Sequence, residues 1–371
     1  MTNYGFLSTY PPTQCGLATF STALAAHMRT GPDQVAVVSA VDAYSPDAPA
    51  EVRYQWVRDR YDQVGPAADV LNQTDVVVLQ HEYGIFGGTD GDQLLEVLHR
   101  LEVPLIATLH TVLTDPSPRQ REILEDVAAQ ASTVVTMTRA ARDRLVRGYR
   151  IDPSVVKVVP HGAPDRWPTF DRPQPRPWRM LTWGLIGPGK GIEWGIEAMA
   201  RMTDLDLVYE IVGETHPKVA AASGEAYRHH LMDLARQHGV ADRVVFRGEY
   251  LDANRLRQVV GSADLVLLPY ESRDQVTSGV LVEAVAAGRA VVSTDFPHAR
   301  ELLGAGNGLL VPPRDPEAIA AAVRRAVSEP GLAAALQRRA RRLAPSLSWT
   351  AVGEAYRRLA AQAVSGRAIA S

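Results

Sequence analysis

The sequence predicts an α/β protein built from two doubly wound parallel sheets that follow one another along the chain. Short runs rich in valine, isoleucine and leucine alternate with longer helical patterns, and this alternation is typical of parallel strands joined by covering helices. A proline-rich stretch, residues 163–178, divides the alternation into two halves and predicts a stiff linker. We expect the two halves to face each other across a central cleft, which would be the natural binding site.

The bulk composition is that of a globular protein. The chain has 371 residues, of which 46% are hydrophobic and 22% charged, and a net charge of −3. That charge gives no general attraction to nucleic acid. A single cysteine, Cys15, excludes an intrachain disulfide and favours a reducing, cytoplasmic location. Neither a signal-peptide pattern nor an apolar run of about 18 residues is present, so no membrane span is expected.

Six arginines gather near the C-terminus, at positions 324, 325, 338, 339, 341 and 342. We interpret this basic helical region as a solvated helix face. Transient contact with anionic lipid or with an anionic substrate is the alternative, so the sequence predicts peripheral membrane contact at most.

The elements of the first half follow from β-branched runs and amphipathic segments. The clearest strand is Asp75 to Gln80, whose central residues are three consecutive valines. The expected strands are 4–9, 34–40, 75–80, 104–108, 133–137 and 155–159, and the expected helices are 17–28, 119–130 and 139–149.

The second half repeats the alternation. Its expected strands are 180–183, 207–212, 244–247, 264–269, 290–294 and 308–311. Its expected helices are 192–202, 227–238, 254–262, 280–287 and 316–326, the last with proline at its first position. Residues 295–300 are expected to form a loop.

Three histidines, His81, His110 and His161, each fall just past the end of a predicted strand. The carboxyl ends of parallel strands form the ligand edge of such a sheet, so we expect at least one of them to touch substrate. A zinc site is the rival interpretation, but the three lie far apart without a short-spaced ligand pair. Gly16 ends a loop before a helix at the same edge and is weaker evidence for a phosphate cradle.

The stretch from residue 264 to 288 carries the strongest pattern for a ligand site. A buried strand leads into a polar loop, and Ser278 and Gly279 then open a helix. The N–H groups of Ser278, Gly279 and Val280 would face outward with the positive end of the helix dipole, which suits a phosphate. Glu283, one turn further in, could accept hydrogen bonds from a pair of sugar hydroxyls. An ordinary strand–helix unit with a solvated loop is the alternative.

A glycine-rich loop at 184–191 opens the second half and contains Lys190, which resembles a phosphate-binding lysine at a helix start. The full Walker pattern is absent, because no serine or threonine follows Lys190, and this argues against an NTPase.

Several of these segments together resemble the retaining glycosyltransferases of family 4, which have two Rossmann-like domains in the GT-B arrangement. The resemblance covers nearly the whole chain and is most specific at 264–288, which is similar to the family's motif of two glutamates separated by seven residues. The other similar segments are the Gly16 loop, 108–111, 159–162, 184–191 and 348–356. Two departures stand out: Gln275 occupies the first glutamate position, and Leu185 replaces the diphosphate-binding arginine.

The resemblance implies an acceptor domain at 1–165, completed by a C-terminal helix at 350–371 that crosses back, and a donor domain at 178–349. It implies transfer of a hexose from a nucleoside-diphosphate sugar, of the GDP-mannose or UDP-glucose type, to an acceptor hydroxyl with retention. No cofactor or metal is expected, and AspGlyAsp at 90–92 and AspLeuAsp at 204–206 are interpreted as surface acids.

The site residues that the resemblance implies fall into three groups. The catalytic group is His110, Lys190, Gln275 and Glu283. The donor-binding group is Gly184, Gly189, Lys190, Gly213, Glu249, Thr277, Ser278, Gly279, Val280 and Glu283. The acceptor side is Gly16, His81, Glu82 and His161.

Two other functions stay open from the sequence. A retaining glycoside phosphorylase on the same fold would use inorganic phosphate, and a non-catalytic protein would bind sugar nucleotides without turnover. Phosphate-dependent cleavage of an oligosaccharide would identify the first, and donor binding without hydrolysis the second.

Overall fold

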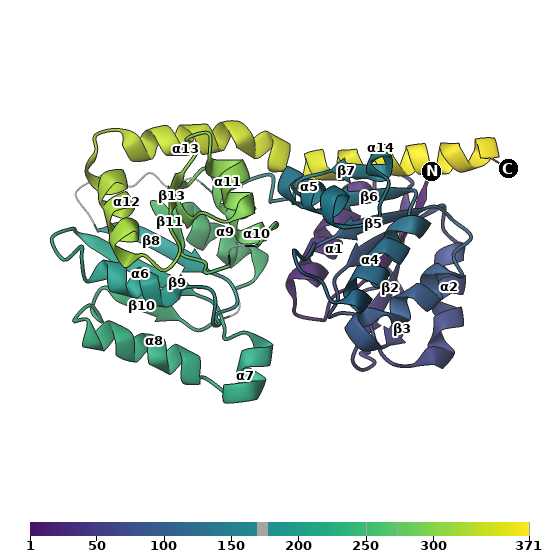
Figure 1. The fold of residues 1–371 in the computed structure, drawn as a ribbon, viewed down its shortest axis with the longest axis horizontal. Coiled ribbons are helices and arrows are strands. Elements are labelled where there is room, and N and C mark those ends of the chain that lie inside the picture. Colours follow the sequence, from purple (N-terminus) through teal and green to yellow (C-terminus); the bar gives the residue numbers. More distant parts are fainter. Residues whose placement is uncertain (169–176, 250, 273, 371) are drawn as a thin grey trace. The chain divides into compact units, whose positions relative to one another are not determined.

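A computed structural model describes residues 1–168, 177–249, 251–272 and 274–370 of the chain. The chain forms two compact units (Figure 1). The first comprises Met1–Gly162 together with Trp349–Ser371, and the second comprises Ala163–Ser348. The central part of the predicted proline-rich linker, residues 169–176, lies outside the described residues.

The first unit is a seven-stranded parallel sheet in the order β3-β2-β1-β4-β5-β6-β7, with helices on both faces (Figure 1). Its strands are β1 Asn3–Ser8, β2 Gln34–Val41, β3 Val52–Val57, β4 Val76–His81, β5 Leu105–Leu109, β6 Thr133–Thr136 and β7 Val156–Val158. Its helices are α1 Gly16–Met28, α2 Val64–Asn72, α3 Gln93–Leu98, α4 Pro118–Gln130, α5 Arg139–Gly148 and α14 Trp349–Ala370. Every residue of β4 is buried, as expected for a central strand covered on both faces.

The second unit is a six-stranded parallel sheet in the order β10-β9-β8-β11-β12-β13. Its strands are β8 Trp178–Trp183, β9 Leu207–Val212, β10 Val244–Arg247, β11 Leu265–Leu268, β12 Ala290–Thr294 and β13 Leu309–Val311. Its helices are α6 Ile192–Met199, α7 Pro217–Ser223, α8 Ala226–Gln237, α9 Ala253–Ser262, α10 Gly279–Ala286, α11 Pro297–Leu303, α12 Pro316–Ser328 and α13 Leu332–Leu343.

Successive residues of β11 point to opposite faces of the second sheet, as the period of a strand requires. Leu265 and Leu267 belong to one hydrophobic core, whereas Val266 and Leu268 belong to the other. The sheet is therefore packed on both faces, and only its edges and strand ends can carry a ligand site. The prediction of two doubly wound parallel sheets is confirmed.

One element prediction is wrong. Residues 295–300 were expected to form a loop, but α11 begins at Pro297. Proline suits the first turn of a helix because the N–H that it lacks would have no intrahelical partner there.

The edge strand β3, which pairs with β2, was not predicted, and five of its six residues are half-buried or exposed.

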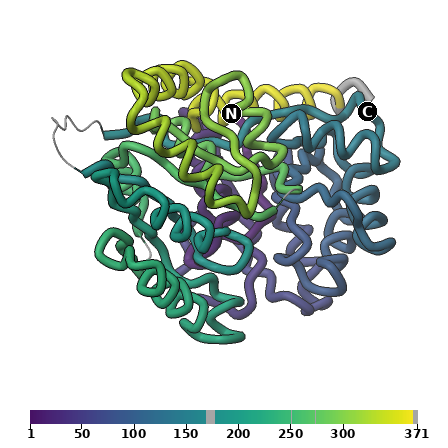
Figure 2. Tube along the Cα trace, turned by 60° about the vertical axis from the view of Figure 1, so that its left-hand side comes forward, coloured from purple at the N-terminus to yellow at the C-terminus, as the bar shows by residue number. Residues whose placement is uncertain are grey.

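The last helix, α14, packs on α1 within the first unit (Figure 2). Gly353 permits a close approach, because a Cβ there would lie 2.6 Å from the carbonyl oxygen of His27 in α1. The Tyr356 hydroxyl also hydrogen-bonds Thr108 Oγ1 in β5 at 2.9 Å, and both groups are buried. The C-terminal helix is therefore an integral part of the first unit.

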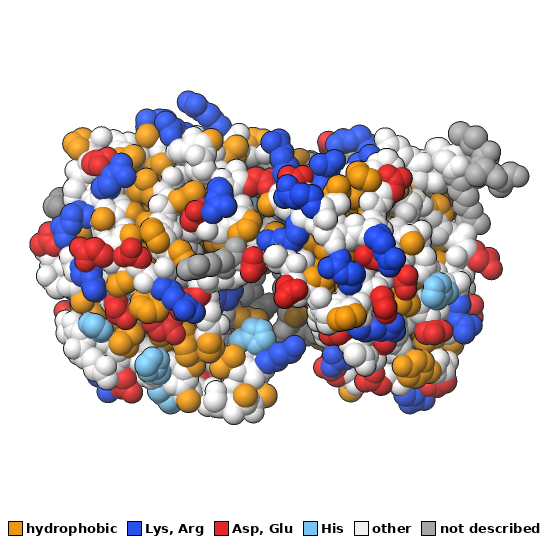
Figure 3. Space-filling model, in the orientation of Figure 1, with side chains coloured by type: hydrophobic (Ala, Val, Ile, Leu, Met, Phe, Trp, Pro, Cys, Tyr) orange, Lys and Arg blue, Asp and Glu red, His pale blue; other side chains and the backbone are white. Residues whose placement is uncertain are grey.

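Charged side chains of both signs are interspersed over the face drawn in Figure 3. Two of the C-terminal arginines are paired with acids: Arg324 with Asp204 and Arg325 with Glu329. Among the described residues, none of the helices combines the length and the apolar character needed to cross a bilayer.

Replacing Tyr356 by phenylalanine is expected to loosen α14. The change leaves the buried Thr108 hydroxyl without this partner, so the opening free energy of α14 should fall by about 1 kcal/mol. Native-state hydrogen exchange of the α14 amides measures this quantity. Tyr44→Phe is the control, because Tyr44 is 73% exposed. Equal protection in both variants would contradict the assigned contact.

Candidate functional site

The ends of β8, β9 and β11 approach one another so closely that only glycine fits between them. Gly213, just after β9, has φ of +139°, and a Cβ there would overlap the carbonyl oxygen of Gly184. Gly191 has φ of +64°, and a Cβ there would overlap the carbonyl oxygen of Pro269. These two contacts hold the 184–191 loop at the carboxyl edge of the sheet, where α/β proteins bind ligands.

Lys190 lies in this loop, half-buried, with its Nζ 4.7 Å from the centre of the Tyr270 ring. Burial lowers the pKa of Lys190 from its ordinary value. In the part of the chain that the structure describes, no carboxylate forms an ion pair with it. A half-buried ammonium that is held by a π face and lacks a counter-ion suits an anionic ligand.

Helix α10 begins beside this loop, with Ser278 as its N-cap. The Ser278 hydroxyl accepts from the N–H of Leu281 at 3.2 Å. The N–H groups of Gly279 and Val280 have no acceptor among the described residues. Two amides at the positive end of the helix dipole are therefore available to a phosphate.

The expectation that the Ser278 N–H also faces outward is wrong. It donates to Nδ1 of His298 in α11 at 2.9 Å, so it is already satisfied. The His298 N–H in turn donates to the carbonyl oxygen of Gln275 at 3.4 Å. His298, which the sequence did not single out, thus ties the loop before α10 to α11 at two points.

Glu283 projects from the second turn of α10, half-buried, and one of its oxygens accepts from the Trp183 indole N–H at 3.2 Å. Burial raises the pKa of Glu283 to about 7, and the Trp183 hydrogen bond opposes this rise. Near neutral pH this carboxyl group is therefore partly protonated, unlike an ordinary surface glutamate.

The loop before α10 carries Gln275 and Thr277. The Gln275 amide donates to the Thr277 carbonyl at 2.9 Å, so it stabilises its own loop. Thr277 Oγ1 is buried and has no hydrogen-bond partner in the part of the chain that the structure describes. A buried hydroxyl without a partner at a ligand edge is a group that a bound molecule could satisfy.

Other acids and arginines near this edge are already paired. Glu271 accepts from the Trp194 indole at 2.7 Å and from Arg314 at 2.9 Å, so it does not replace the carboxylate that Gln275 lacks. Glu249 pairs with Arg255 at 3.2 Å. Leu185 occupies the position of the family's diphosphate-binding arginine, and two other arginines that could replace that charge are already paired: Arg247 with Glu210, and Arg300 with Asp295. A third, Arg273, lies outside the described residues.

In the first unit, His110 and His161 meet around Phe20, whose ring centre lies 4.8 Å from that of His110 and 5.0 Å from that of His161. His110 Nε2 also hydrogen-bonds the Gln80 side chain at 2.8 Å. His81 packs on Tyr83, and its carbonyl oxygen accepts from the His110 N–H at 3.1 Å, whereas its Nδ1 has no hydrogen-bond partner among the described residues.

Burial makes all three histidines neutral at physiological pH. It lowers the pKa of His81 and His161 to about 4 and that of His110 to about 3. Neutral imidazoles can donate or accept hydrogen bonds, but they supply no positive charge to an anion.

Glu82 follows β4 and is held by the next strand end. It accepts from the Thr111 hydroxyl at 2.6 Å and from the Tyr83 N–H at 3.1 Å. Gly16 is the first residue of α1, where the Cys15 thiol caps the helix by accepting from the Ala18 N–H. Cys15 is thus structural in this position.

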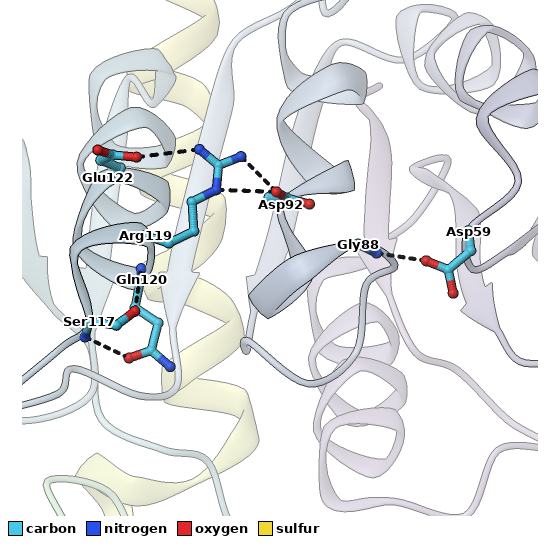
Figure 4. Close-up of polar contacts among 7 residues, drawn as sticks. All are labelled: Asp59, Gly88, Asp92, Ser117, Arg119, Gln120 and Glu122. Carbon is cyan, nitrogen blue, oxygen red and sulfur yellow. Dashed lines mark hydrogen bonds and ion pairs between the residues drawn. The ribbon is translucent and has the colours of Figure 1, made fainter.

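The loop after Glu82 is fixed by polar contacts that the sequence did not predict (Figure 4). The Gly88 N–H donates to Asp59 at 2.7 Å, and Arg119 of α4 donates twice to Asp92, at 2.6 and 3.1 Å. Ser117 and Gln120 form a reciprocal capping box at the start of α4. These contacts connect the loop to Asp59 and to α4. Across the described residues, no group of three or more acids, histidines or cysteines is arranged to hold a metal ion.

Comparison with known families settles the classification. Residues 15–166 match the glycosyltransferase family 4 model, and residues 179–329 match the model for glycosyl transferases group 1. A D-inositol 3-phosphate glycosyltransferase of Kineococcus radiotolerans is 30% identical over 312 residues, which cover 72% of this chain and 68% of that protein. The chain belongs to glycosyltransferase family 4.

Other family relatives are similar at comparable levels. A D-inositol 3-phosphate glycosyltransferase of Rhodococcus jostii is 33% identical over 70% of this chain, and a glycogen synthase of Mycobacterium tuberculosis is 28% identical over 68%. The aligned region spans 62% of the length of each of these two relatives.

Solved glycosyltransferase structures share the fold. Anabaena Alr3699/HepE, determined in complex with UDP and glucose, superposes with a TM-score of 0.77 at 16% identity, covering 98% of this chain and 100% of that one. A Rickettsia africae glycosyltransferase gives 0.78 at 13% identity, covering 98% and 99%. The predicted GT-B fold is confirmed.

Two glycine substitutions test the loop geometry of this family 4 protein. Gly191→Ala is expected to lower the free energy of unfolding by at least about 3 kcal/mol, because its Cβ overlaps the Pro269 carbonyl. Gly189→Ala is the matched control: its φ is also positive, at +86°, but its Cβ would meet open space, so about 1 kcal/mol is expected. Urea unfolding measures both, and equal losses would contradict the close approach.

Glu283→Gln is expected to stabilise the protein at pH 8 but not at pH 5. Because the folded-state pKa lies above the unfolded value, stability falls as pH rises from about 4.5 to 7, and the ionised carboxylate then costs about 3 kcal/mol. Glu271→Gln should destabilise the protein at pH 8, because Arg314 and Trp194 lower the pKa of Glu271 and so stabilise its ionised form. Urea midpoints at the two pH values measure this. A destabilised Glu283→Gln protein at pH 8 would refute the buried charge.

Proposed function

We propose that the protein transfers a hexose from a nucleoside-diphosphate sugar to an acceptor hydroxyl with retention of anomeric configuration. The observation that carries the proposal is the group of unsatisfied polar atoms at one edge of the second sheet. Among the described residues these are the Lys190 ammonium, which has no ion-pair partner, the amides of Gly279 and Val280, which have no acceptor, and the Glu283 oxygen that Trp183 does not hold. Together they offer positive charge to a diphosphate and an acceptor to a ribose.

In this scheme the donor diphosphate lies on Lys190 and on the two amides, and Glu283 accepts from the ribose hydroxyls. Departure of the nucleoside diphosphate places negative charge on the leaving phosphate, and preorganised donors stabilise that charge. Lys190 and the amides of α10 supply such donors, so the proposed reaction needs no metal ion. The glycosyltransferase and synthase names of the relatives and the UDP and glucose of HepE support a donor of the UDP-glucose type, whereas the GDP-mannose type rests on the sequence resemblance alone.

We assign the acceptor side to the first unit, at the edge that carries Gly16, His81, Glu82 and His161, with His110 at the reacting centre. His110 would serve there as a neutral hydrogen-bonding group, because burial keeps its pKa at about 3. The Glu82 carboxylate, held by Thr111, would offer an acceptor for a hydroxyl. The acceptor would therefore be a small molecule, glycan or lipid that presents a hydroxyl group.

The first experiment is a donor panel. Thermal shift and isothermal titration with UDP-glucose, GDP-mannose and ADP-glucose should show saturable binding of at least one of them, and turnover should survive EDTA. Binding of none of the three would overturn the proposal. Cleavage of an oligosaccharide by inorganic phosphate, without any nucleotide, would favour a phosphorylase instead.

Lys190→Ala is expected to reduce kcat at least about 100-fold, because it removes the Lys190 ammonium from the proposed leaving-group site. Glu283→Ala is expected to weaken donor binding about tenfold or more. Steady-state kinetics and titration of the bound donor measure the two effects. Lys157→Ala is the control, since Lys157 is an exposed lysine of β7. Wild-type kinetics in Lys190→Ala would contradict the site assignment.

A further inference from the structure

Trp183 and Glu283 form a hydrogen-bonded pair that joins the start of the glycine loop to helix α10. Trp183 is the last residue of β8, directly before Gly184, and is only 6% exposed. Its Nε1 donates to Oε2 of Glu283 at 3.2 Å, across 100 residues of sequence. The resemblance to family 4 pointed to Glu283 but not to this partner.

The chemistry of the pair leaves one carboxylate oxygen available. An indole N–H can only donate, and a carboxylate accepts at both oxygens. Oε2 is held by Trp183, whereas Oε1 has no partner among the described residues. The rigid indole therefore fixes the orientation of the carboxylate and leaves the second oxygen free to accept.

We propose that Trp183 is a positioning residue for donor binding: its N–H holds the Glu283 carboxyl group by one oxygen and favours the ionised form, so that the other oxygen accepts from the ribose hydroxyls. This inference rests on the proposed function, because it assumes that a nucleotide ribose binds at Glu283. It goes beyond that function by assigning to the indole N–H a part of the donor affinity.

The groups around Glu283 make this contribution dependent on pH. Burial raises the pKa of Glu283 to about 7, and the Trp183 N–H is the interaction that lowers it. The Tyr270 hydroxyl is the nearby titratable group, and burial keeps it neutral by raising its pKa. Lys190 lies over the Tyr270 ring. Without the indole N–H, the carboxylate should ionise only at higher pH.

Among the described residues, α11 brings one further ionisable side chain to α10, His298, whose Nδ1 accepts from the Ser278 N–H at the start of the helix. Helix α13 places Arg341 against Gly288, beyond the C-terminal end of α10. Strand β12 and the short helix Ala344–Leu347, which also pack on α10, carry no ionisable side chain. Among the described residues, Trp183 is thus the side chain that donates a hydrogen bond to this carboxyl group and opposes the effect of burial on its pKa.

The test is the pH dependence of donor affinity in Trp183→Phe. The wild type is first titrated with UDP-glucose, GDP-mannose and ADP-glucose. The donor that it binds is then titrated into both proteins by isothermal titration between pH 6 and 9. We expect the affinity of Trp183→Phe to fall about tenfold at pH 7 and to recover toward the wild-type value at pH 9. The midpoint of its pH profile should lie higher than that of the wild type. Trp178→Phe, on the same strand, controls for loss of an indole without loss of this hydrogen bond.

Each outcome decides the inference separately from the proposed function. If the wild type binds none of the three donors, the proposed function fails. If the wild type binds but Trp183→Phe has the same affinity and midpoint, this inference alone is wrong. A loss that is equal at every pH would also overturn it, because a packing defect has no reason to follow the ionisation of Glu283.

A variant of identical shape covers the case in which Trp183→Phe does not fold. Replacing Trp183 by β-(3-benzothienyl)alanine exchanges the indole N–H for sulfur and keeps the ring volume. The same shift of the pH midpoint is expected, and an unchanged midpoint would overturn the inference. In a Glu283→Gln background, donor affinity should not depend on pH, and replacing Trp183 there should leave this pH profile unchanged. A change of the profile in that background would overturn the inference, because Trp183 would then act through a group other than Glu283.

Discussion

The architecture of the second unit depends on backbone contacts that exclude every side chain. At Gly213 and Gly191, a single Cβ would overlap a carbonyl oxygen of a neighbouring strand end. Because β8, β9 and β11 can approach this closely, the 184–191 loop folds onto the carboxyl edge of the sheet and places Lys190 over Tyr270. The glycines thus do more than permit a turn. They bring the polar atoms of three separate segments to the start of one helix, where the helix dipole already favours an anion.

The electrostatics of that edge differ from those of the rest of the chain. Elsewhere, some buried charges have partners of opposite sign: Glu125 binds Arg150, and Glu210 binds Arg179. Lys190 has no counter-ion among the described residues, Glu283 has a single neutral donor, and two amides of α10 have no acceptor. Unsatisfied groups of this kind reduce stability, and their concentration at one place is typical of a binding site. In the first unit the corresponding edge holds neutral histidines instead.

Local pattern was enough to predict the two sheets, apart from the edge strand β3, and the local structure of the segments that form the candidate site. The valine run of β4, the glycines around Lys190 and the cap at Ser278 are signals within a few residues, and each recurs in the structure. Contacts between distant segments were not predictable in this way. His298 meets Ser278 across 20 residues and Trp183 meets Glu283 across 100, so no periodicity or spacing reveals either pair. The loop expected at 295–300 failed for a local reason, because proline can open a helix as readily as it can interrupt one.

The central claim is that a donor diphosphate binds the unsatisfied groups at the edge of the second unit. The most direct measurement is a crystal structure of the protein with the nucleotide sugar that it binds most tightly. The account predicts phosphate oxygens within hydrogen-bond distance of Lys190 Nζ and of the Gly279 and Val280 amides, with the ribose on Glu283. A nucleotide bound only to the first unit, or to the second unit away from Lys190 and α10, would contradict it.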